Sequence, residues 1–326
     1  MAKKATVQNP IPVAKMIAKF LIPFSIADPF PVRHETKEYV FAEKFSAVDN
    51  FGKICCYELD SRGMPYREIG TLESPHHRSY PCILEFDGEK YMTCEAVENN
   101  ELVVFQCTDF PYRWEPCSVV ASDRSYSDPT LFWFNGFWWV MATAYDKYSS
   151  GNSTLYAWHS KNGIRGPWTA HAKNPIKCDI SNTRSAGTPF LSEGRFYRPA
   201  QDCSKTYGRA IVMNEILQLD PNNFREREIR KIQAHSDLPK GIHHISGQDG
   251  CTFIDGRRSI FMPSLALRKI LYRFRKKKSV TSRYINSIDL VNNDLTANEN
   301  DKSENTRGHL VFKKVLPQKC VLEFNL

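Results

Sequence analysis

The 326-residue sequence predicts an all-β fold, a five-bladed β-propeller with a short basic helical insertion near the C-terminus. Three observations favour this class. A pair of short apolar strands joined by a tight turn recurs five times, the copies follow one another at intervals near 50 residues, and aromatic and β-branched residues dominate them. Short strands at such a period are typical of propellers, whose sheets pack around a common axis because none buries both faces alone.

The third copy, SYSDPTLFWFNGFWWVMATAY at residues 125–145, defines the repeat. Its Asn135-Gly136 pair suits the positive-φ corner of a tight hairpin, and its Asp-Pro start is by itself a common turn opener. The prolines of the first four copies (Pro29, Pro81, Pro129 and Pro189) are 52, 48 and 60 residues apart. The five copies span 26–45, 78–97, 125–145, 185–204 and 248–266, and the last two have a shorter first strand before the turn glycines Gly194 and Gly256.

The pattern divides the chain into four segments. Residues 1–25 form an N-terminal arm, 26–263 the propeller body, 264–308 a basic amphipathic segment with a flexible polar excursion, and 309–326 the strands that complete the last blade. No stretch approaches the roughly 18 apolar residues of a membrane span, and Lys15 and Lys19 argue against a cleavable secretion signal. Ten scattered cysteines without paired-ligand spacing indicate buried thiols in a reducing cytoplasm, not disulfides or structural zinc.

The net charge of +8 comes almost entirely from one segment. The stretch LALRKILYRFRKKK, which begins at Leu265 and ends at Lys278, contains seven Lys or Arg and no acid, and without these seven charges the chain carries +1. Its apolar residues fall at helical spacing beside the basic face. Two interpretations stay open: a peripheral contact with an anionic membrane, and a solvated helix or loop on the propeller rim. Nucleic acid is not expected as a partner, because no basic stripe with interleaved aromatics runs through the body.

Four carboxylates are expected at one mouth of the central channel. In a blade the first strand lines the channel and the second returns beside it, so the start of the first strand and the end of the second lie together. Asp28 and Asp128 precede the prolines, and Glu43 and Glu95 stand fourteen residues after them. Because proline disfavours helical backbone before it, Asp28 is expected to be extended. Such carboxylates suit acid–base chemistry on a sugar, and the alternative is that several of them pair with Arg or Lys or bridge blades.

Further polar groups are expected to bind substrate at the same mouth. Arginines near carboxylates either bind a phosphate or serve as structural partners. The adjacent His243 and His244 should point to opposite faces of a strand, so at most one is expected to serve the site. No zinc motif or Gly-rich phosphate loop is present, so no metal or cofactor is expected, with calcium in the channel left open. The candidate binding residues are Tyr80, Arg184, Arg198, Gln201, Asp202, Lys205, Tyr207, Arg209, His243, His244 and Asp249.

Several motifs resemble those of a known family. The stretches IADPF, RSYP with MTCEA, YSDPTLF, RSAGTPF, YRPAQDCSKTYGRAI and GIHHISGQDGCTFIDG resemble the propeller-like N-terminal domain of glucosamine inositolphosphorylceramide transferases and related bacterial polysaccharide-synthesis proteins. More distantly, the pattern is similar to five-bladed glycosidases of the arabinanase, xylosidase and fructosidase type. Those enzymes use an aspartate of the first blade as base or nucleophile, and Asp28 matches its position. Tyr80 stands where they often carry an acid, and SAGTPF lacks their acid glutamate, so Glu43 or Glu95 takes that role or the protein hydrolyses no glycoside.

The resemblance implies a carbohydrate-active enzyme, a glycosyltransferase of polysaccharide or glycolipid assembly. It would be cytoplasmic, or peripheral to a membrane through the basic segment, with a nucleotide- or phosphate-linked sugar donor and a glycan or glycolipid acceptor. In this interpretation Asp28 activates the acceptor hydroxyl, while Asp128, Glu43 and Glu95 orient the sugar or tune Asp28. Arg184, Arg198 and Arg209 hold the donor phosphate. The alternatives are a furanosidase-type glycoside hydrolase and a non-catalytic glycan-binding module.

Overall fold

The computed structural model describes residues 24–257, except 73, 97–99, 147–148, 235, 237 and 249–250, together with 269, 272 and 308–311. Between 24 and 257 the described residues form strands and their connections, without helix, so the all-β prediction is confirmed. None of the described residues belongs to a helix long and apolar enough to cross a membrane. Residues 1–23 of the predicted N-terminal arm and nearly all of the basic segment 264–308 lie outside the described residues, whereas Phe24 and Ser25 already belong to the first strand. The helical insertion stays a prediction.

The strands form five antiparallel sheets. The first contains β1 (Phe24–His34), β2 (Lys37–Ser46), β3 (Phe51–Leu59) and β4 (Pro65–Leu72), and the second β5 (Ser79–Phe86), β6 (Glu89–Glu95), β7 (Leu102–Asp109) and β8 (Arg113–Ala121). The third contains β9 (Tyr126–Phe134), β10 (Phe137–Asp146), β11 (Ser149–Ser160), β12 (Thr169–Ala170) and β13 (Lys177–Cys178). The fourth contains β14 (Phe190–Ser192), β15 (Arg195–Asp202), β16 (Ala210–Asp220) and β17 (Asn223–Gln233), and the fifth β18 (Gly241–Gln248), β19 (Cys251–Arg257) and β20 (Gly308–Val311).

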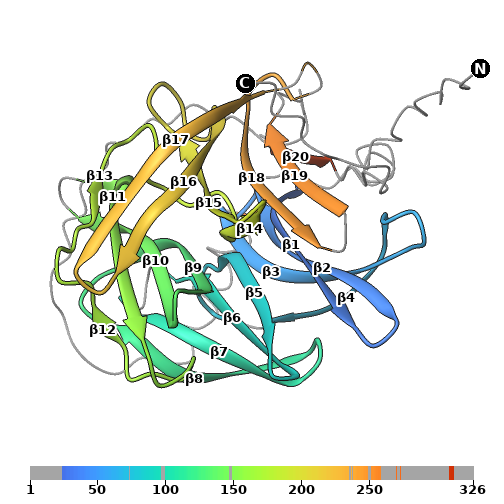
Figure 1. The fold of residues 1–326 in the computed structure, drawn as a ribbon. Coiled ribbons are helices and arrows are strands. Elements are labelled where there is room, and N and C mark those ends of the chain that lie inside the picture. Colours follow the sequence, from blue (N-terminus) through green and yellow to red (C-terminus); the bar gives the residue numbers. More distant parts are fainter. Residues whose placement is uncertain are drawn as a thin grey trace, which may run out of the picture.

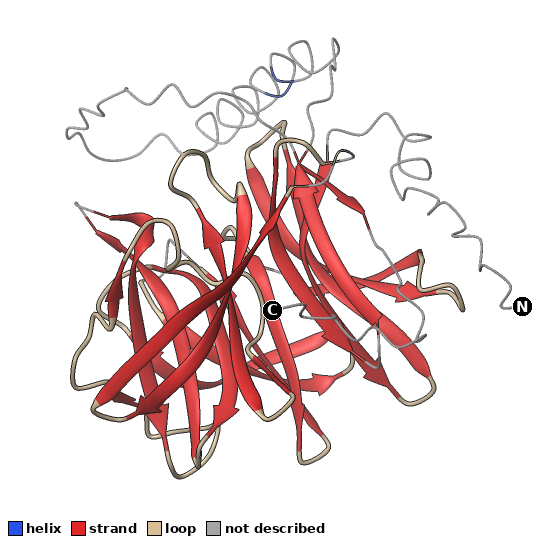
Figure 2. Cartoon of the chain, turned by 45° about the horizontal axis from the view of Figure 1, so that its top comes forward, coloured by secondary structure: helices blue, strands red, loops and turns tan. Residues whose placement is uncertain are grey.

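The sheets follow one another around a common centre, with the first strands β1, β5, β9 and β18 innermost (Figure 1). Figure 2 shows the chain turned from the view of Figure 1, and the described part consists mostly of strands joined by loops. Four sheets have four or more strands each, which confirms a propeller-like fold. The fifth sheet has three described strands, so five complete blades remain a prediction.

The predicted hairpin corners form where the sequence places them in the first four copies. Asn135 and Gly136 have φ of 49° and 81°, and the flanking residues Phe134 and Phe137 pair across the turn. Such φ values match the right-handed twist of the two strands. Buried aromatic and aliphatic side chains then fill the space between sheets, with Trp139 fully buried. The strand cysteines Cys82 and Cys94 are buried free thiols, as predicted.

The predicted register of the fifth copy is wrong. Its strands are β18 and β19, so the corner lies between Gln248 and Cys251, and Gly256 is inside β19. This glycine marks close packing and not a turn, because a Cβ there would lie 2.5 Å from Leu238 Cδ1 and 3.0 Å from the Gly241 oxygen.

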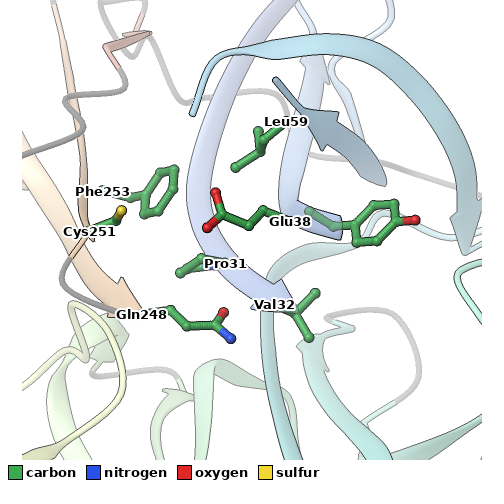
Figure 3. A pocket seen from close by; sticks show the side chains of 8 residues that line it. Pro31, Val32, Glu38, Leu59, Gln248, Cys251 and Phe253 are labelled. Atoms are coloured by element: carbon green, nitrogen blue, oxygen red, sulfur yellow. The ribbon is translucent and has the colours of Figure 1, made fainter. Parts of the chain in front are cut away.

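A shallow apolar pocket lies between the first and fifth sheets (Figure 3). Val32, Leu59, Gln248 and Phe253 line it, and its volume is about 10 Å³. This volume admits roughly one water molecule. The pocket is therefore too small for a sugar, and none of the predicted carboxylates lines it.

Candidate active site

Three sheets share an unusual backbone at the residue before a proline, near the start of the innermost strand. Asp28, Tyr80 and Asp128 have φ of 52°, 51° and 48°. The expectation of an extended Asp28 is therefore wrong, and each non-glycine residue in such a left-handed conformation costs about 1–3 kcal/mol. In the first sheet the pairing with β2 is interrupted between Ala27 and Phe30, which is a β-bulge. A bulge redirects the side chain at this point, and strain of this kind is typical of functional sites.

Asp128 is held by an arginine and an amide. Arg184 donates from Nε to Asp128 Oδ2 at 2.7 Å and from Nη2 to Oδ1 at 2.9 Å, a bidentate pair. Gln201 Nε2 donates to the same Oδ2 at 2.8 Å, and Arg184 Nη1 reaches the Gly151 carbonyl at 3.2 Å. Both oxygens of Asp128 are thus occupied inside the protein. For Arg184 the structural-partner interpretation fits better than a free phosphate ligand.

Asp28 has different partners, two histidines and a second aspartate. His243 Nε2 and His244 Nδ1 lie 3.6 Å and 3.7 Å from Asp28 Oδ1, which accepts no hydrogen bond from the described residues. His243 Nδ1 lies 2.9 Å from Asp255 Oδ1, and Asp255 Oδ2 accepts the Asp28 backbone N–H at 2.9 Å. Asp255, His243 and Asp28 therefore form a buried chain that can hold or move a proton.

Burial and charge set the protonation of this chain. Burial raises the pKa of Asp28 well above its ordinary value, outweighing the nearby His243. Burial opposes charge on His243, but Asp255 outweighs burial and raises the His243 pKa above its ordinary value. Burial lowers the pKa of His244 to about 4, so this imidazole is neutral near pH 7. Both shifts favour the protonated forms, so Asp28 and His243 each hold a proton to a higher pH than they would in water.

The expectation that His243 and His244 point to opposite faces of the strand is wrong, and whether both serve the site stays a prediction. The pairing of β18 with β19 shifts between Gly241 and His244, so His243 lies in a bulge. Strict alternation is lost there. Both imidazoles therefore approach the same oxygen of Asp28.

Glu43 and Glu95 complete the carboxylate cluster. Burial raises the pKa of Glu95 to about 7, although Arg184 Nη2 lies 3.5 Å away. Burial also raises the pKa of Glu43 well above its ordinary value, and the charges of Asp28, Glu95 and Asp128 add to this effect. Glu43 Oε1 lies 3.7 Å from His77 Nε2. The structure thus brings Asp28, Glu43, Glu95 and Asp128 together.

Asp202 lies apart from this cluster. Lys231 Nζ and Arg209 Nη1 donate to its Oδ2 at 2.9 Å and 3.2 Å. It follows Gln201 on β15, and adjacent strand residues point to opposite faces. Gln201 therefore reaches Asp128, while Asp202 faces the basic residues.

Arg198 and Tyr80 have structural partners. Arg198 donates to both oxygens of Glu226, at 2.7 Å and 2.8 Å, and is almost fully buried. The Tyr80 hydroxyl lies 3.0 Å from Thr130 Oγ1 and accepts the Gly187 N–H at 2.9 Å. Tyr80 thus ties three sheets together beneath the cluster, and neither side chain is available to a ligand in this arrangement.

Tyr207 covers the basic side of the cluster. Its ring is 37% exposed and lies 5.1 Å from the Arg184 guanidinium and 5.4 Å from that of Arg257. The His243 ring is 5.4 Å away. Lys205 is exposed on the same loop. Asp249 lies outside the described residues.

The sequence interpretation missed Asp255 and Arg257. Arg257 pairs with Gly241 as Glu43 pairs with Ala27, so an arginine occupies the glutamate position in the fifth sheet. The stretch FIDGR contains both residues and could have indicated them. Because the turn was predicted at Gly256, the stretch was not recognised as part of the second strand. With Gln248 paired to Cys251, Asp255 falls near the end of the second strand.

Asp28, His243 and Asp255 also offer three ligand atoms within 4.8 Å of one another. Two carboxylates and an imidazole suit a transition metal better than calcium, which takes six to eight oxygen ligands. Asp255 accepts the backbone N–H groups of Asp28 and His244, each at 2.9 Å. Both oxygens of Asp255 thus already accept backbone hydrogen bonds, and calcium in the channel stays a prediction.

The fold and this site define a propeller-like protein with a carboxylate cluster contributed by β1, β2, β6 and β9. Residues 2–249 match the family model described as glucosamine inositolphosphorylceramide transferase 1, N-terminal. The chain belongs to this family, and the resemblance inferred from the motifs is confirmed.

Plant relatives cover the same region. The glucosamine inositolphosphorylceramide transferase 1 of Oryza sativa subsp. japonica is 32% identical over 205 residues, 62% of this chain and 27% of the relative. That of Arabidopsis thaliana is 29% identical over 229 residues, 68% of this chain and 30% of the relative. The matches thus span less than a third of these relatives.

Solved structures share the fold. The catalytic domain of a Coprinopsis cinerea GH62 α-L-arabinofuranosidase matches with a TM-score of 0.56 at 13% identity, over 74% of this chain and 87% of that one. A family 117 glycoside hydrolase of Zobellia galactanivorans matches with a TM-score of 0.52 at 13% identity, over 74% and 82%. At such identity the likeness concerns the fold alone.

Proposed function

We propose that this protein is a glycosyltransferase-type enzyme of glycolipid or polysaccharide assembly, with Asp28 as the base that activates the acceptor hydroxyl. The observation that carries the proposal is the state of Asp28. It is strained, almost fully buried and linked through His243 to Asp255, yet its Oδ1 accepts no hydrogen bond from the described residues. A turn residue needs none of these features. Membership of a family named for a transferase supports the reaction class.

In the proposed reaction the acceptor oxygen attacks the anomeric carbon of the donor sugar while the bond to the leaving group breaks. The acceptor proton passes to Asp28 Oδ1, and His243 shares it. Asp255 fixes the His243 ring through Nδ1 and stabilises its charged form. General base catalysis of this kind contributes about 10² to 10⁴ in rate.

The donor phosphate needs a basic partner. Arg184 and Arg198 are buried and bound to Asp128 and Glu226. In this proposal the phosphate therefore lies against Lys205 and Arg209, which are more exposed, although Arg209 also donates to Asp202. We further propose a cytoplasmic protein whose basic segment, from Leu265 to Lys278, contacts anionic lipid. Retention on anionic vesicles at low salt and release at high salt would test this contact.

A glycoside hydrolase is the second candidate, and Glu95 favours it. A carboxyl with a pKa of about 7 is suited to protonate a leaving oxygen near neutral pH. In that reaction water replaces the acceptor at Asp28. Transfer from a nucleotide-linked donor needs no such acid, because the phosphate leaves as a stable anion without being protonated.

Product analysis separates the candidates. The protein is incubated with nucleotide sugars plus glycolipid or glycan acceptors, and in a separate reaction with aryl glycosides. The products of both reactions are identified by mass spectrometry. Sugar transfer that is lost in Asp28→Asn supports the proposal. Release of free sugar from glycosides supports the hydrolase. Glycan binding without turnover of any substrate would leave a binding module.

A further inference from the structure

The cluster is most open on the side of the first sheet. The side chain of Glu43 is 13% exposed, against 7% for Asp28, 6% for Glu95 and 3% for Asp128. His77, its neighbour, is 24% exposed. A ligand that reaches the carboxylates without rearranging the core therefore meets Glu43 and His77 first.

The aromatic rings of Phe45 and Phe51 lie beside His77 at this opening. Phe45 is the second-last residue of β2 and lies on the same face as Glu43, since residues two apart in a strand share a face. The ring centroids of Phe45 and Phe51 lie 6.4 Å and 6.2 Å from that of His77, at steep angles of 68° and 84°. All three rings are partly exposed. We call Phe45, Phe51 and His77 the first-sheet platform.

A glycine makes room for the polar end of the platform. Gly52 pairs with Phe45, and a Cβ at Gly52 would contact Glu43 Oε1 and lie 2.6 Å from His77 Cε1. The Gly52 N–H donates to His77 Nδ1 at 2.9 Å, which leaves Nε2 directed toward Glu43. The backbone of β3 thus orients the imidazole beside the carboxyl.

We propose that the first-sheet platform with Glu43 is a sugar subsite, which binds a neutral pyranose or furanose ring. The C–H face of the ring packs on the aromatic side chains, whose negative faces attract it, and ring hydroxyls hydrogen-bond to Glu43 and His77. Aromatic rings beside one carboxyl and one imidazole match the alternating apolar and hydroxyl surfaces of a sugar. This inference rests on the proposed function only in placing the sugar next to Asp28.

The test is direct binding of three simple probes, methyl glucoside, methyl N-acetylglucosaminide and methyl arabinofuranoside. Saturation-transfer NMR reports millimolar affinities and ring orientation. Phe45→Leu keeps an apolar side chain but removes the aromatic face, and it should weaken binding roughly fivefold to tenfold. Tyr112→Leu is the matched control, because Tyr112 is 54% exposed on the β7–β8 turn of another sheet. It should bind like the wild type.

Gly52→Ala is the second variant. It adds one methyl group that displaces Glu43 and His77 while leaving Phe45 in place, so binding should weaken by a similar factor with a near-native melting temperature. Asp28→Asn should bind the probe normally. If the wild-type protein bound a probe but turned over no substrate, the proposed function would be wrong and the sugar subsite would still be supported. No binding of any probe, or equal binding by wild type and Phe45→Leu, would overturn the subsite even if the enzyme transfers sugar.

Discussion

Asp28 and Asp128 occupy equivalent positions but have opposite surroundings. Both precede a proline, both have positive φ and both are almost fully buried. Asp128 faces Arg184 and Gln201, which satisfy its two oxygens. Asp28 faces two imidazoles and leaves one oxygen without a hydrogen bond from the described residues.

The difference shows that the repeat determines the backbone conformation of the two aspartates, whereas residues of other sheets determine which side chains contact their carboxylates. In both sheets the register shifts near the Asp-Pro pair, and the aspartate side chain is buried. At Asp128 an arginine and an amide then occupy both carboxylate oxygens. At Asp28 the nearby His243 can instead exchange a proton with the carboxyl.

Replacing aspartate by asparagine should therefore lower turnover at position 28 and lower stability at position 128. Asp28→Asn removes the base and should lower turnover by about 10² to 10⁴ at a near-native melting temperature. Asp128→Asn leaves the Arg184 charge largely uncompensated and should destabilise the fold by about 3–5 kcal/mol. Turnover assays and urea unfolding of both variants measure the contrast. If both variants lost turnover and unfolding free energy to a similar extent, the two aspartates would not differ in role.

The pH dependence of stability sharpens the comparison, because Glu95 lies beside the Asp128–Arg184 pair. Its pKa rises from 4.5 to about 7 on folding. A raised carboxyl pKa contributes stability that is complete below pH 4.5 and is lost as the pH rises through 7. The loss from this group between pH 5 and 8 is at most about 3 kcal/mol. Glu95→Gln should flatten this part of the unfolding profile, and an unchanged slope would show that Glu95 titrates normally.

Tyr80, the third residue of the set, should behave as a structural tie. Tyr80→Phe removes the hydroxyl that contacts Thr130 and Gly187. We expect a loss of about 1–3 kcal/mol in unfolding free energy, since the Gly187 N–H is left buried without its acceptor. Turnover should stay within a few-fold of wild type. A selective loss of turnover at native stability would move Tyr80 into the reaction.

The sequence predicts the sheets and the convergence of carboxylates well, because both follow from a period of strands and turns. Proline spacing located Asp28 and Asp128, and strand polarity placed Glu43 and Glu95 at the same end. These features depend on local residues.

The partners of those carboxylates could not be read from the sequence. Whether Arg184 binds a ligand or Asp128 depends on contacts 56 residues apart in the chain. The bulge that brings His243 and His244 to one oxygen breaks the alternation on which the prediction relied. Asp255 was lost because Gly256 looked like a turn, although close packing is what requires a glycine there.

The most direct test of the central claim is the titration of the Asp28 carboxyl itself. Carboxyl ¹³C NMR of the wild type, with the Asp28 signal assigned by its absence in Asp28→Asn, gives this pKa without a substrate. The account predicts a pKa well above the ordinary value of 3.8, because burial disfavours the charge and the nearby His243 offsets only part of that effect. A pKa at or below 3.8 would show that burial does not raise the proton affinity of Asp28, and it would contradict the proton sharing between Asp28 and His243 on which the proposed reaction depends.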